Sequence, residues 1–335
     1  IGVLTAILND PTGYGRMVRD PEGHILRVVE QKDASEAEVE IEEINTGIMV
    51  FDRAKLADWL QRIDNRNAQS EYYLTDVIGL AVEDGFEVAT TQPEYEEEVQ
   101  GVNDRVQLAH LERFFQQSQA RSLMKSGITL ADPARFDLRG SLKAARDVFI
   151  DINTVIEGEV ELADGVSIGP NCVLKNCRIG AGTSVFANTV IEDAAIGSDA
   201  RIGPFSRIRP AADLADRVHV GNFVEIKKSQ VGAGSKVNHL TYIGDSHIGS
   251  GVNVGAGTIT CNYDGANKHQ TLIGDGAFIG SNTALVAPVS VGDGATIAAG
   301  STITRDAPAD KLTIARTGQK TIEGWRKPIK GRGNK

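Results

Sequence analysis

Small aliphatic residues recur at every sixth position through about half of this chain, and this period constrains the fold more than any other feature. The anchors are isoleucine, leucine or valine, and they run from Ile156 to Ile303 with occasional steps of five and one break after Val254. Glycine follows many anchors directly, as at Gly169 and Gly292, where a tight corner needs backbone angles that a side chain resists. Such hexapeptide repeats predict a parallel β-helix.

The spacing also predicts the geometry of the solenoid. Each hexad supplies one short strand and one corner, and three hexads close a triangular coil of about 18 residues. Successive coils stack at roughly 4.8 Å, so the anchors form an apolar column inside a three-sided prism. An inert scaffold could have the same pattern, and the polar residues gathered at the single break argue against that interpretation.

The chain is too long for the repeat alone, so its 335 residues predict at least one further unit. Short apolar strands alternate with amphipathic helices over residues 1–103, which predicts an α/β domain. Asp104 and Gly127 suit the two ends of a connecting helix over residues 104–126. The β-helix domain and its tail then take residues 127–335.

The composition excludes several function classes. A net charge of -10 and an isoelectric point near 5.2 argue against nonspecific nucleic-acid binding. No apolar run reaches the length of a membrane span, and no signal peptide leads the chain. Cys172, Cys177 and Cys261 lack the spacing of a metal site and fit a reducing compartment. We therefore expect a soluble, cytoplasmic protein without nucleic-acid or membrane partners.

The break in the repeat is surrounded by polar residues. A solenoid coil tolerates an insertion only at a corner, so residues 258–268 should leave the prism as a loop, where repeat proteins commonly carry function. Polar segments at residues 222–228 and 238–242 precede this loop. The second of them contains His239, and histidine is the residue type that suits a general base near neutral pH. We therefore predict an active site here.

The first part of the chain carries a series of motifs in the order of a known family. They are Pro11–Arg16 (PTGYGR), Val29–Asp33 (VEQKD), Ile44–Gly47 (INTG), Ser70–Asp76 (SEYYLTD) and Glu98–Asn103 (EVQGVN). They resemble the second half of a sugar-1-phosphate nucleotidyltransferase. Together with the repeats, the whole chain resembles the bifunctional bacterial N-acetylglucosamine-1-phosphate uridylyltransferase and glucosamine-1-phosphate N-acetyltransferase family. The resemblance implies a left-handed β-helix, a known exception to the right-handed crossover preference.

The resemblance implies an enzyme with acetyl-CoA as co-substrate. The β-helix would acetylate the amine of glucosamine-1-phosphate, and the intact protein would use UTP to convert the product to UDP-N-acetylglucosamine for peptidoglycan and lipopolysaccharide synthesis. The second activity uses Mg2+ and a glycine-rich loop with a catalytic lysine, and no such loop occurs in this sequence. We therefore expect an N-terminal segment before this chain in the intact protein, and no uridylyl transfer by these 335 residues alone.

Matched residue by residue, the resemblance assigns His239 as the catalytic base. It assigns sugar-phosphate binding to Arg209, Lys227, Tyr242, Asn253, Asn262 and Lys268. It assigns acetyl-CoA binding to Asn262, Tyr263, Ser281, Ala299, Arg316 and Ala256, the last through a backbone amide that stabilises the oxyanion. It assigns the UDP-N-acetylglucosamine site to Gly15, Glu30, Asn45 and Asn103, the last also a magnesium ligand. The implied assembly is a homotrimer with active sites in grooves between subunits.

Two alternatives remain open from the sequence. A hexapeptide carbonic anhydrase would bind zinc through three histidines, for which His219, His239 and His247 are available, and a zinc assay would discriminate it. An inert solenoid scaffold would release no thiol from acetyl-CoA.

Overall fold

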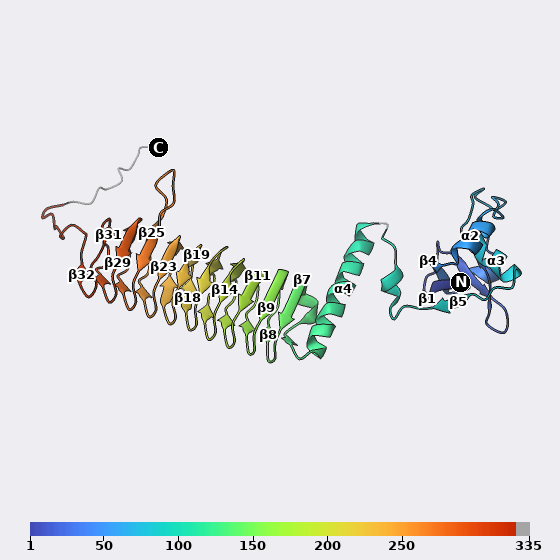
Figure 1. Ribbon diagram of the computed structural model, residues 1–335, viewed down its shortest axis with the longest axis horizontal. Coiled ribbons are helices and arrows are strands. Elements are labelled where there is room, and N and C mark those ends of the chain that lie inside the picture. The colour runs from blue at the N-terminus through green and yellow to red at the C-terminus, as the bar shows by residue number, and fades with distance from the viewer. Residues whose placement is uncertain (103, 326–335) are drawn as a thin grey trace, which may run out of the picture. The chain divides into compact units, whose positions relative to one another are not determined.

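The computed structural model describes residues 1–102 and 104–325, and the chain divides into two compact units, Ile1–Phe114 and Phe115–Lys335. The first unit contains a small mixed sheet with helices, and the second contains a long β-helix (Figure 1). None of the helices in the described ranges is long and apolar enough to cross a membrane.

The first unit is built on a five-stranded sheet in the order β3-β2-β4-β1-β5. Its strands are β1 (Gly2–Ile7), β2 (Arg16–Arg19), β3 (Ile25–Val29), β4 (Glu43–Val50) and β5 (Ala89–Thr91). Strand β1 pairs antiparallel with β4 and parallel with β5. The helices of the unit are α1 (Glu36–Val39), α2 (Arg53–Leu60), α3 (Asp76–Glu83) and the 3-10 helix η1 (Glu96–Val99). The unit therefore has the expected mixture of strands and helices.

Helix α4 (Arg105–Lys125) contains the boundary between the two units and covers the first coil of the β-helix. The buried Gln116 side chain donates a hydrogen bond from Nε2 to the Leu138 carbonyl at 3.0 Å and accepts one from the Leu138 N–H at 2.7 Å. Leu138 lies in β7 (Phe136–Ala144), which follows the 3-10 helix η2 (Pro133–Arg135). Because an open sheet edge invites pairing with other chains, this contact protects the end of the solenoid.

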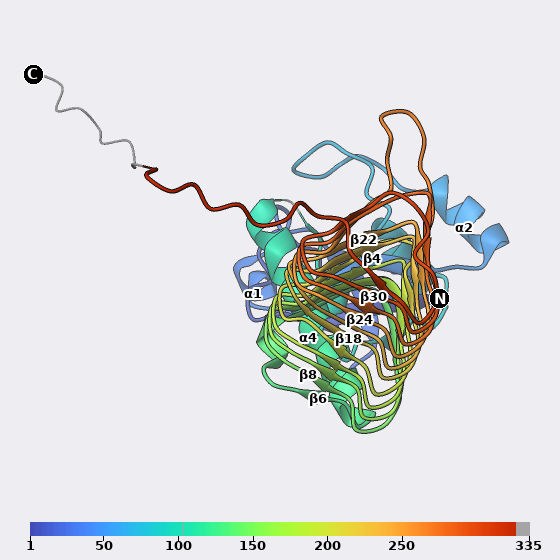
Figure 2. The same ribbon diagram turned by 90° about the vertical axis from the view of Figure 1, so that its left-hand side faces the viewer.

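The β-helix has three faces, and every ladder between neighbouring coils is parallel, as the view along its axis shows (Figure 2). The first face contains β6 (Thr129–Leu130), β8 (Phe149–Ile150), β10 (Ser167–Ile168), β12 (Ser184–Val185), β15 (Arg201–Ile202), β18 (His219–Asn222), β21 (Lys236–His239), β24 (Asn253–Val254), β27 (Phe278–Ile279), β30 (Thr296–Ile297) and β32 (Leu312–Thr313).

The second face follows the first along the chain. It contains β13 (Val190–Glu192), β16 (Arg207–Ile208), β19 (Glu225–Lys227), β22 (Tyr242–Gly244), β25 (Ile259–Cys261), β28 (Ala284–Val286) and β31 (Thr302–Ile303). The third face contains β14 (Ala195–Ile196), β17 (Asp213–Leu214), β20 (Gln230–Val231), β23 (Ser246–Ile248), β26 (Thr271–Ile273) and β29 (Val289–Val291). Near the start, the second and third faces are joined by the long strands β7, β9 (Thr154–Leu162) and β11 (Val173–Ile179).

All the predicted aliphatic anchors from Ile156 to Ile303 are buried in one continuous core, with at most 4% of any anchor exposed. The stack also extends past both ends of the predicted repeat, from β6 to β32. At the N-terminal end the inward residues Leu138, Ala144 and Ile150 keep the six-residue spacing, and only Leu130, which pairs with Ile150, lies two residues out of step.

The insertion is shorter than expected, because Thr260 occupies the anchor position after Val254 and is 1% exposed. Its hydroxyl accepts a hydrogen bond from the Gly244 N–H at 2.8 Å and lies 3.3 Å from the Gly244 carbonyl oxygen. A buried hydroxyl that is hydrogen-bonded can replace an aliphatic anchor. The chain therefore leaves the coil only between β25 and β26, where the loop projects from the prism (Figure 2).

Candidate active site of the β-helix

Four predicted residues form a column along the edge where the first face turns into the second. His239, Ala256, Ser281 and Ala299 occupy this corner on successive coils. Backbone hydrogen bonds connect the coils here: the Gly257 N–H donates to the His239 carbonyl at 3.2 Å, and the Asn282 N–H donates to the Ala256 carbonyl at 2.7 Å. On the next coil, the Gly300 N–H donates to the Ser281 carbonyl at 2.8 Å. We call this set the edge column.

Arg316 joins the edge column at its far end. Its Nη1 donates a hydrogen bond to the Ala299 carbonyl oxygen of the same chain at 2.5 Å. The guanidinium is otherwise exposed, so a planar cation stands at the end of the row that the resemblance assigns to acetyl-CoA. Arginine is suited to phosphate oxygens because it presents several N–H donors in one plane.

His239 ends β21, and its side chain lines a cavity of about 320 Å³ together with Arg201, His219, Asn222 and Asn238. Its carbonyl oxygen accepts a second hydrogen bond, from the Thr241 hydroxyl at 2.6 Å, so the backbone at the corner is fixed. Burial lowers the pKa of His219, and the nearby Arg201, Lys236 and His239 lower it further. The neutral form of His219 is therefore favoured.

The corner next to His239 carries large apolar residues where other coils have asparagine or glycine. Phe205, Phe223 and Leu240 have φ angles of 55°, 56° and 49°, and they are 49%, 58% and 64% exposed. The two phenylalanine rings stack with centroids 5.5 Å apart. A bulky residue in the left-handed region costs about 1–3 kcal/mol. The hexapeptide period does not predict this apolar ladder of Phe205, Phe223 and Leu240, although its members recur in the sequence at a spacing of one coil.

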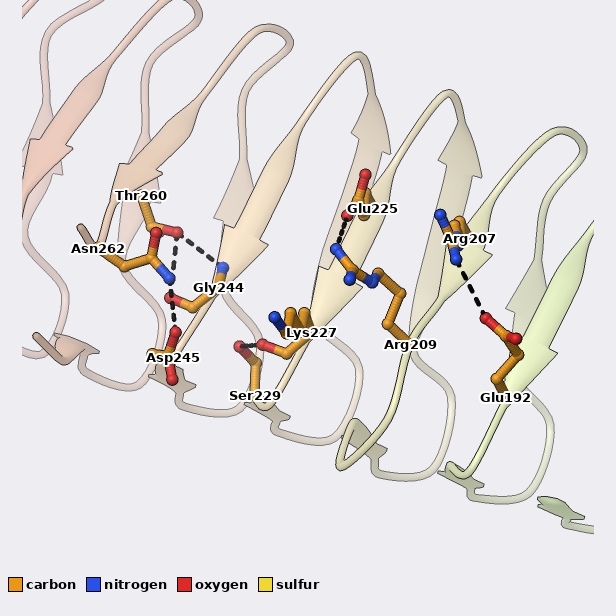
Figure 3. Close-up of polar contacts among 10 residues, drawn as sticks. All are labelled: Glu192, Arg207, Arg209, Glu225, Lys227, Ser229, Gly244, Asp245, Thr260 and Asn262. Atoms are coloured by element: carbon orange, nitrogen blue, oxygen red, sulfur yellow. Dashed lines mark hydrogen bonds and ion pairs between the residues drawn. The ribbon is translucent and has the colours of Figure 1, made fainter. Parts of the chain in front are cut away.

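The second face carries a cluster of cations (Figure 3). The pairing of β16 with β19 places Arg209 beside Lys227. Arg209 Nη1 donates to Glu225 Oε1 at 2.5 Å, while its Nε is buried and has no partner among the described residues. The Lys268 ammonium lowers the pKa of Lys227 through a direct contact and through its charge, and Arg209 adds to the effect. Cations that repel one another in this way favour an anion between them.

Lys268 lies in the projecting loop, and hydrogen bonds within this loop fix its backbone. Tyr263 and Lys268 form an antiparallel bridge, and the Tyr263 hydroxyl donates to the Gly265 carbonyl at 2.6 Å. The Asp264 carboxylate accepts from the Asn267 and Ala266 N–H groups and lies 2.7 Å from Nε2 of His269. These contacts hold the pKa of Asp264 far below its usual value, chiefly through the backbone N–H of Asn267, then the His269 ring and the backbone N–H of Ala266. The loop is therefore an ordered turn.

Tyr242 and Asn262 come together over Gly244. A Cβ placed on Gly244 would overlap the Tyr242 hydroxyl and would lie 2.7 Å from Asn262 Nδ2. Real Cβ atoms essentially never approach this closely, so a side chain at residue 244 would have to displace both polar groups. Asn253 does not join them, because β24 places it on the first face beside Lys236 and Phe278.

The predicted zinc alternative finds no support in the described part of the chain. No group of three or more histidine, cysteine, aspartate or glutamate side chains there could hold a metal ion. His219 and His239 line the same cavity, whereas His247 lies on β23 of the third face, where its Nδ1 is 2.7 Å from Gln230 Oε1.

The first unit brings together three of the four residues predicted for sugar-nucleotide binding. The Asn45 N–H donates to the Gly15 carbonyl at 2.9 Å, and a Cβ on Gly15 would lie 3.2 Å from Glu30 Oε1. Glu30 Oε1 also accepts from the Thr75 hydroxyl at 2.9 Å. Asn103 lies outside the described residues.

Comparison with known proteins identifies the family. The family model "Bacterial transferase hexapeptide (six repeats)" matches residues 270–305. The bifunctional protein GlmU of Bordetella parapertussis is 60% identical over 330 residues, which cover 98% of this chain and 72% of the relative. The GlmU of Methylococcus capsulatus is 58% identical over 333 residues, covering 99% of this chain and 72% of the relative. The chain belongs to the GlmU family.

Membership of the GlmU family confirms the predicted enzyme, a glucosamine-1-phosphate N-acetyltransferase with acetyl-CoA as co-substrate. It also confirms the hexapeptide β-helix and disfavours the carbonic anhydrase and scaffold alternatives. Among solved structures, the UDP-N-acetylglucosamine acyltransferase of Francisella novicida covers 56% of this chain and 67% of its own length, with 20% identity and a TM-score of 0.29. LpxA from Acinetobacter baumannii covers 52% of this chain and 71% of its own length, with 20% identity and a TM-score of 0.34.

Proposed function

We propose that acetyl transfer takes place between the edge column and the cation cluster of the neighbouring face, with His239 as the general base. The observation that carries this proposal is the arrangement of two distinct sets on adjacent surfaces. One set contains a histidine and stacked backbone groups, and the other contains Arg209, Lys227 and Lys268. An aminosugar phosphate needs a base at its amine and cations at its phosphate.

The reaction assigns a role to each set. The neutral amine nitrogen attacks the thioester carbonyl carbon, a C–N bond forms, and negative charge develops on the carbonyl oxygen. The C–S bond then breaks, coenzyme A leaves as a thiolate, and His239 takes the amine proton and passes it to the sulfur. The Ala256 N–H is proposed to stabilise the oxyanion, since no acceptor for it is found among the described residues.

The remaining residues are proposed to bind the substrates. Arg209, Lys227 and Lys268 would hold the sugar phosphate, while Tyr242, Asn253 and Asn262 would contact the sugar. Tyr263, Ser281, Ala299 and Arg316 would line the path of acetyl-CoA. A general base contributes about 10²–10⁴-fold to such reactions, and fixed cations contribute mainly to binding.

We also propose a homotrimer with active sites between subunits. The apolar ladder of Phe205, Phe223 and Leu240 supports it, because a strained and exposed apolar row beside His239 gains stability only when a second copy covers it. Cyclic packing of a three-sided prism would give three equal sites. Phe223→Asn keeps a residue that tolerates the left-handed region but removes the ring. Light scattering should show dissociation at low concentration for this variant and not for Leu26→Asn, an exposed control in the first unit.

The first unit is proposed to keep part of a UDP-N-acetylglucosamine site through Gly15, Glu30 and Asn45, with Asn103 as a further ligand. No group of three or more histidine, cysteine, aspartate or glutamate side chains that could hold a metal ion is found among the described residues. Magnesium normally takes only one or two protein ligands together with waters and substrate phosphates, and we propose from the family resemblance that Asn103 is one of them. A cytoplasmic location is proposed because acetyl-CoA and UTP are supplied there.

A thiol-release assay tests the proposed function. Wild-type protein with acetyl-CoA should release coenzyme A when glucosamine-1-phosphate is added, and should not when glucose-1-phosphate, which has no amine, replaces it. Equal release with both sugars, or with neither, would contradict the proposal. Burial raises the pKa of Cys172 to about 11 and of Cys177 to about 12, so these two thiols add little background to the assay.

A further inference from the structure

Asn262 has a charged neighbour that the proposed reaction does not use. Asn262 is 6% exposed, and its Nδ2 donates a hydrogen bond to Asp245 Oδ2 at 2.5 Å (Figure 3). The two residues lie 17 positions apart, one coil of the prism. This pair connects a residue proposed to contact the substrate with a carboxylate that has no assigned role.

The chemistry of the pair fixes the orientation of the amide. An ionised carboxylate only accepts hydrogen bonds, so the NH2 group of Asn262 has to face Asp245. The carbonyl oxygen Oδ1 then has to point the other way. No donor for Oδ1 is found in the described ranges, so this acceptor remains available to a ligand.

Asp245 is itself held in place. Its backbone lies in the left-handed region at φ 48°, its N–H donates to the Lys227 carbonyl at 3.1 Å, and its carbonyl accepts from the Thr271 N–H at 3.2 Å. The next residue, Ser246, is buried and donates from its hydroxyl to the Gly244 carbonyl at 2.8 Å. The backbone that carries the Asp245 carboxylate is therefore fixed, one coil before Asn262 in the chain.

We propose that Asp245 is a positioning residue, which orients the Asn262 amide so that Oδ1 accepts an N–H bond from the amine of the sugar phosphate. This inference rests on the proposed function. The hydrogen bond to Oδ1 orients the amine so that the lone pair of its nitrogen is free to attack the thioester, while His239 receives the proton. Asp245 acts only through Asn262 and touches neither substrate.

The chain contains a matched pair far from the site. Asn176 Nδ2 donates to Asp193 Oδ1 at 3.0 Å, and Asp193 occupies the same type of corner, with φ 45°. The two residues are again 17 positions apart. Asp193→Asn therefore removes the same kind of hydrogen bond from the same kind of corner, and it serves as the control for Asp245→Asn.

The two variants are compared in steady-state acetyl transfer. The amide that Asp245→Asn introduces can both donate and accept, so the Asn262 amide is free to turn. We expect kcat to fall about tenfold to a hundredfold for Asp245→Asn, a range typical of a misplaced reacting group. The KM for acetyl-CoA and the melting temperature should match those of Asp193→Asn. A kcat within about twofold of wild type for Asp245→Asn, or an equal loss in Asp193→Asn, would overturn the inference.

Ligand binding provides a readout that does not depend on turnover. By calorimetry, wild-type protein should bind glucosamine-1-phosphate more tightly than 2-deoxyglucose-1-phosphate, and Asp245→Asn should lose this preference. An unchanged preference in the variant would contradict the positioning role. Failure of the proposed function is a separate result, because it appears as a wild-type protein that releases no thiol in response to glucosamine-1-phosphate.

Discussion

In the first unit, three predicted residues meet around Gly15, whereas in the β-helix the predicted residues are distributed over an edge and a face of several coils. Adjacent strands of a small sheet bring Glu30 and Asn45 to the same glycine. Each coil of a solenoid contacts only the coils next to it, so functional groups on successive coils form rows. Such rows cannot close around a ligand. The difference explains why the β-helix needs a projecting loop and, as we propose, a second subunit to complete its site.

Removal of the base should have the largest effect. His239→Ala should lower kcat for acetyl transfer about 10²–10⁴-fold, because the edge column keeps its stacking but loses proton transfer. The neighbouring anchors Val237 and Ile243 are fully buried and untouched, so the melting temperature should stay near that of wild type. His247→Ala, on the third face, is the control. Near-normal turnover of His239→Ala at saturating substrates would mean that the base is another group.

A smaller loss is expected when the space above Gly244 is filled. In Gly244→Ala the added methyl would displace the Tyr242 hydroxyl, which it overlaps, and the Asn262 amide, which lies 2.7 Å from its position. We expect acetyl transfer to fall about tenfold to a hundredfold, since small displacements of positioning groups have effects of this size. The matched change Gly318→Ala meets no atom within 4 Å and should have no effect. Equal kinetics for the two variants would contradict the crowding at Gly244.

The cation cluster should affect binding more than turnover. Lys227→Ala removes one charge-assisted contact to the phosphate, worth about 1.5–3 kcal/mol, so the KM for glucosamine-1-phosphate should rise about tenfold or more at unchanged kcat. Lys175→Ala is the control, because Lys175 faces out from the same face and lies 3.9 Å from Glu157. A fall in kcat with unchanged KM for Lys227→Ala would show that this lysine does not act as a phosphate ligand.

The first unit should respond independently of acetyl transfer. In Gly15→Ala the new Cβ would lie 2.9 Å from Val28 Cγ1, and such overpacking costs about 1–3 kcal/mol. Calorimetry should show a lower transition for the first unit, with acetyl transfer unchanged. In Gly101→Ala the new Cβ would meet no atom within 4 Å, so neither the melting temperature of the first unit nor acetyl transfer should change. Loss of acetyl transfer in Gly15→Ala would mean that the two units are coupled.

The sequence predicted the parts of the fold that repeat and missed the parts that depend on individual polar contacts. The anchors were predictable because every coil needs an aliphatic residue inside. Thr260 was not, because a hydroxyl fills an anchor position only when the next coil hydrogen-bonds it. His239 and the phosphate cations were predicted through the family resemblance.

The pairs that cross from one coil to the next were not predicted. Asp245 with Asn262 and Phe205 with Phe223 each lie one coil apart, so the spacing was visible in the sequence. Whether two such side chains meet depends on the corner conformation, and bulky residues such as Phe223 at positive φ are not favoured by any local preference. The contact of Arg316 with Ala299 of the same chain was also not predicted, because it depends on the path of the chain after the last coil.

A structure of the protein with coenzyme A and N-acetylglucosamine-1-phosphate would locate both products relative to the edge column and the cation cluster. We expect the phosphate to lie on Arg209, Lys227 and Lys268, and the new amide to lie within hydrogen-bond reach of His239 and the Ala256 N–H. The coenzyme A should follow the edge column toward Ala299. A phosphate bound away from these cations, or an acetyl group remote from His239, would show that acetyl transfer takes place elsewhere.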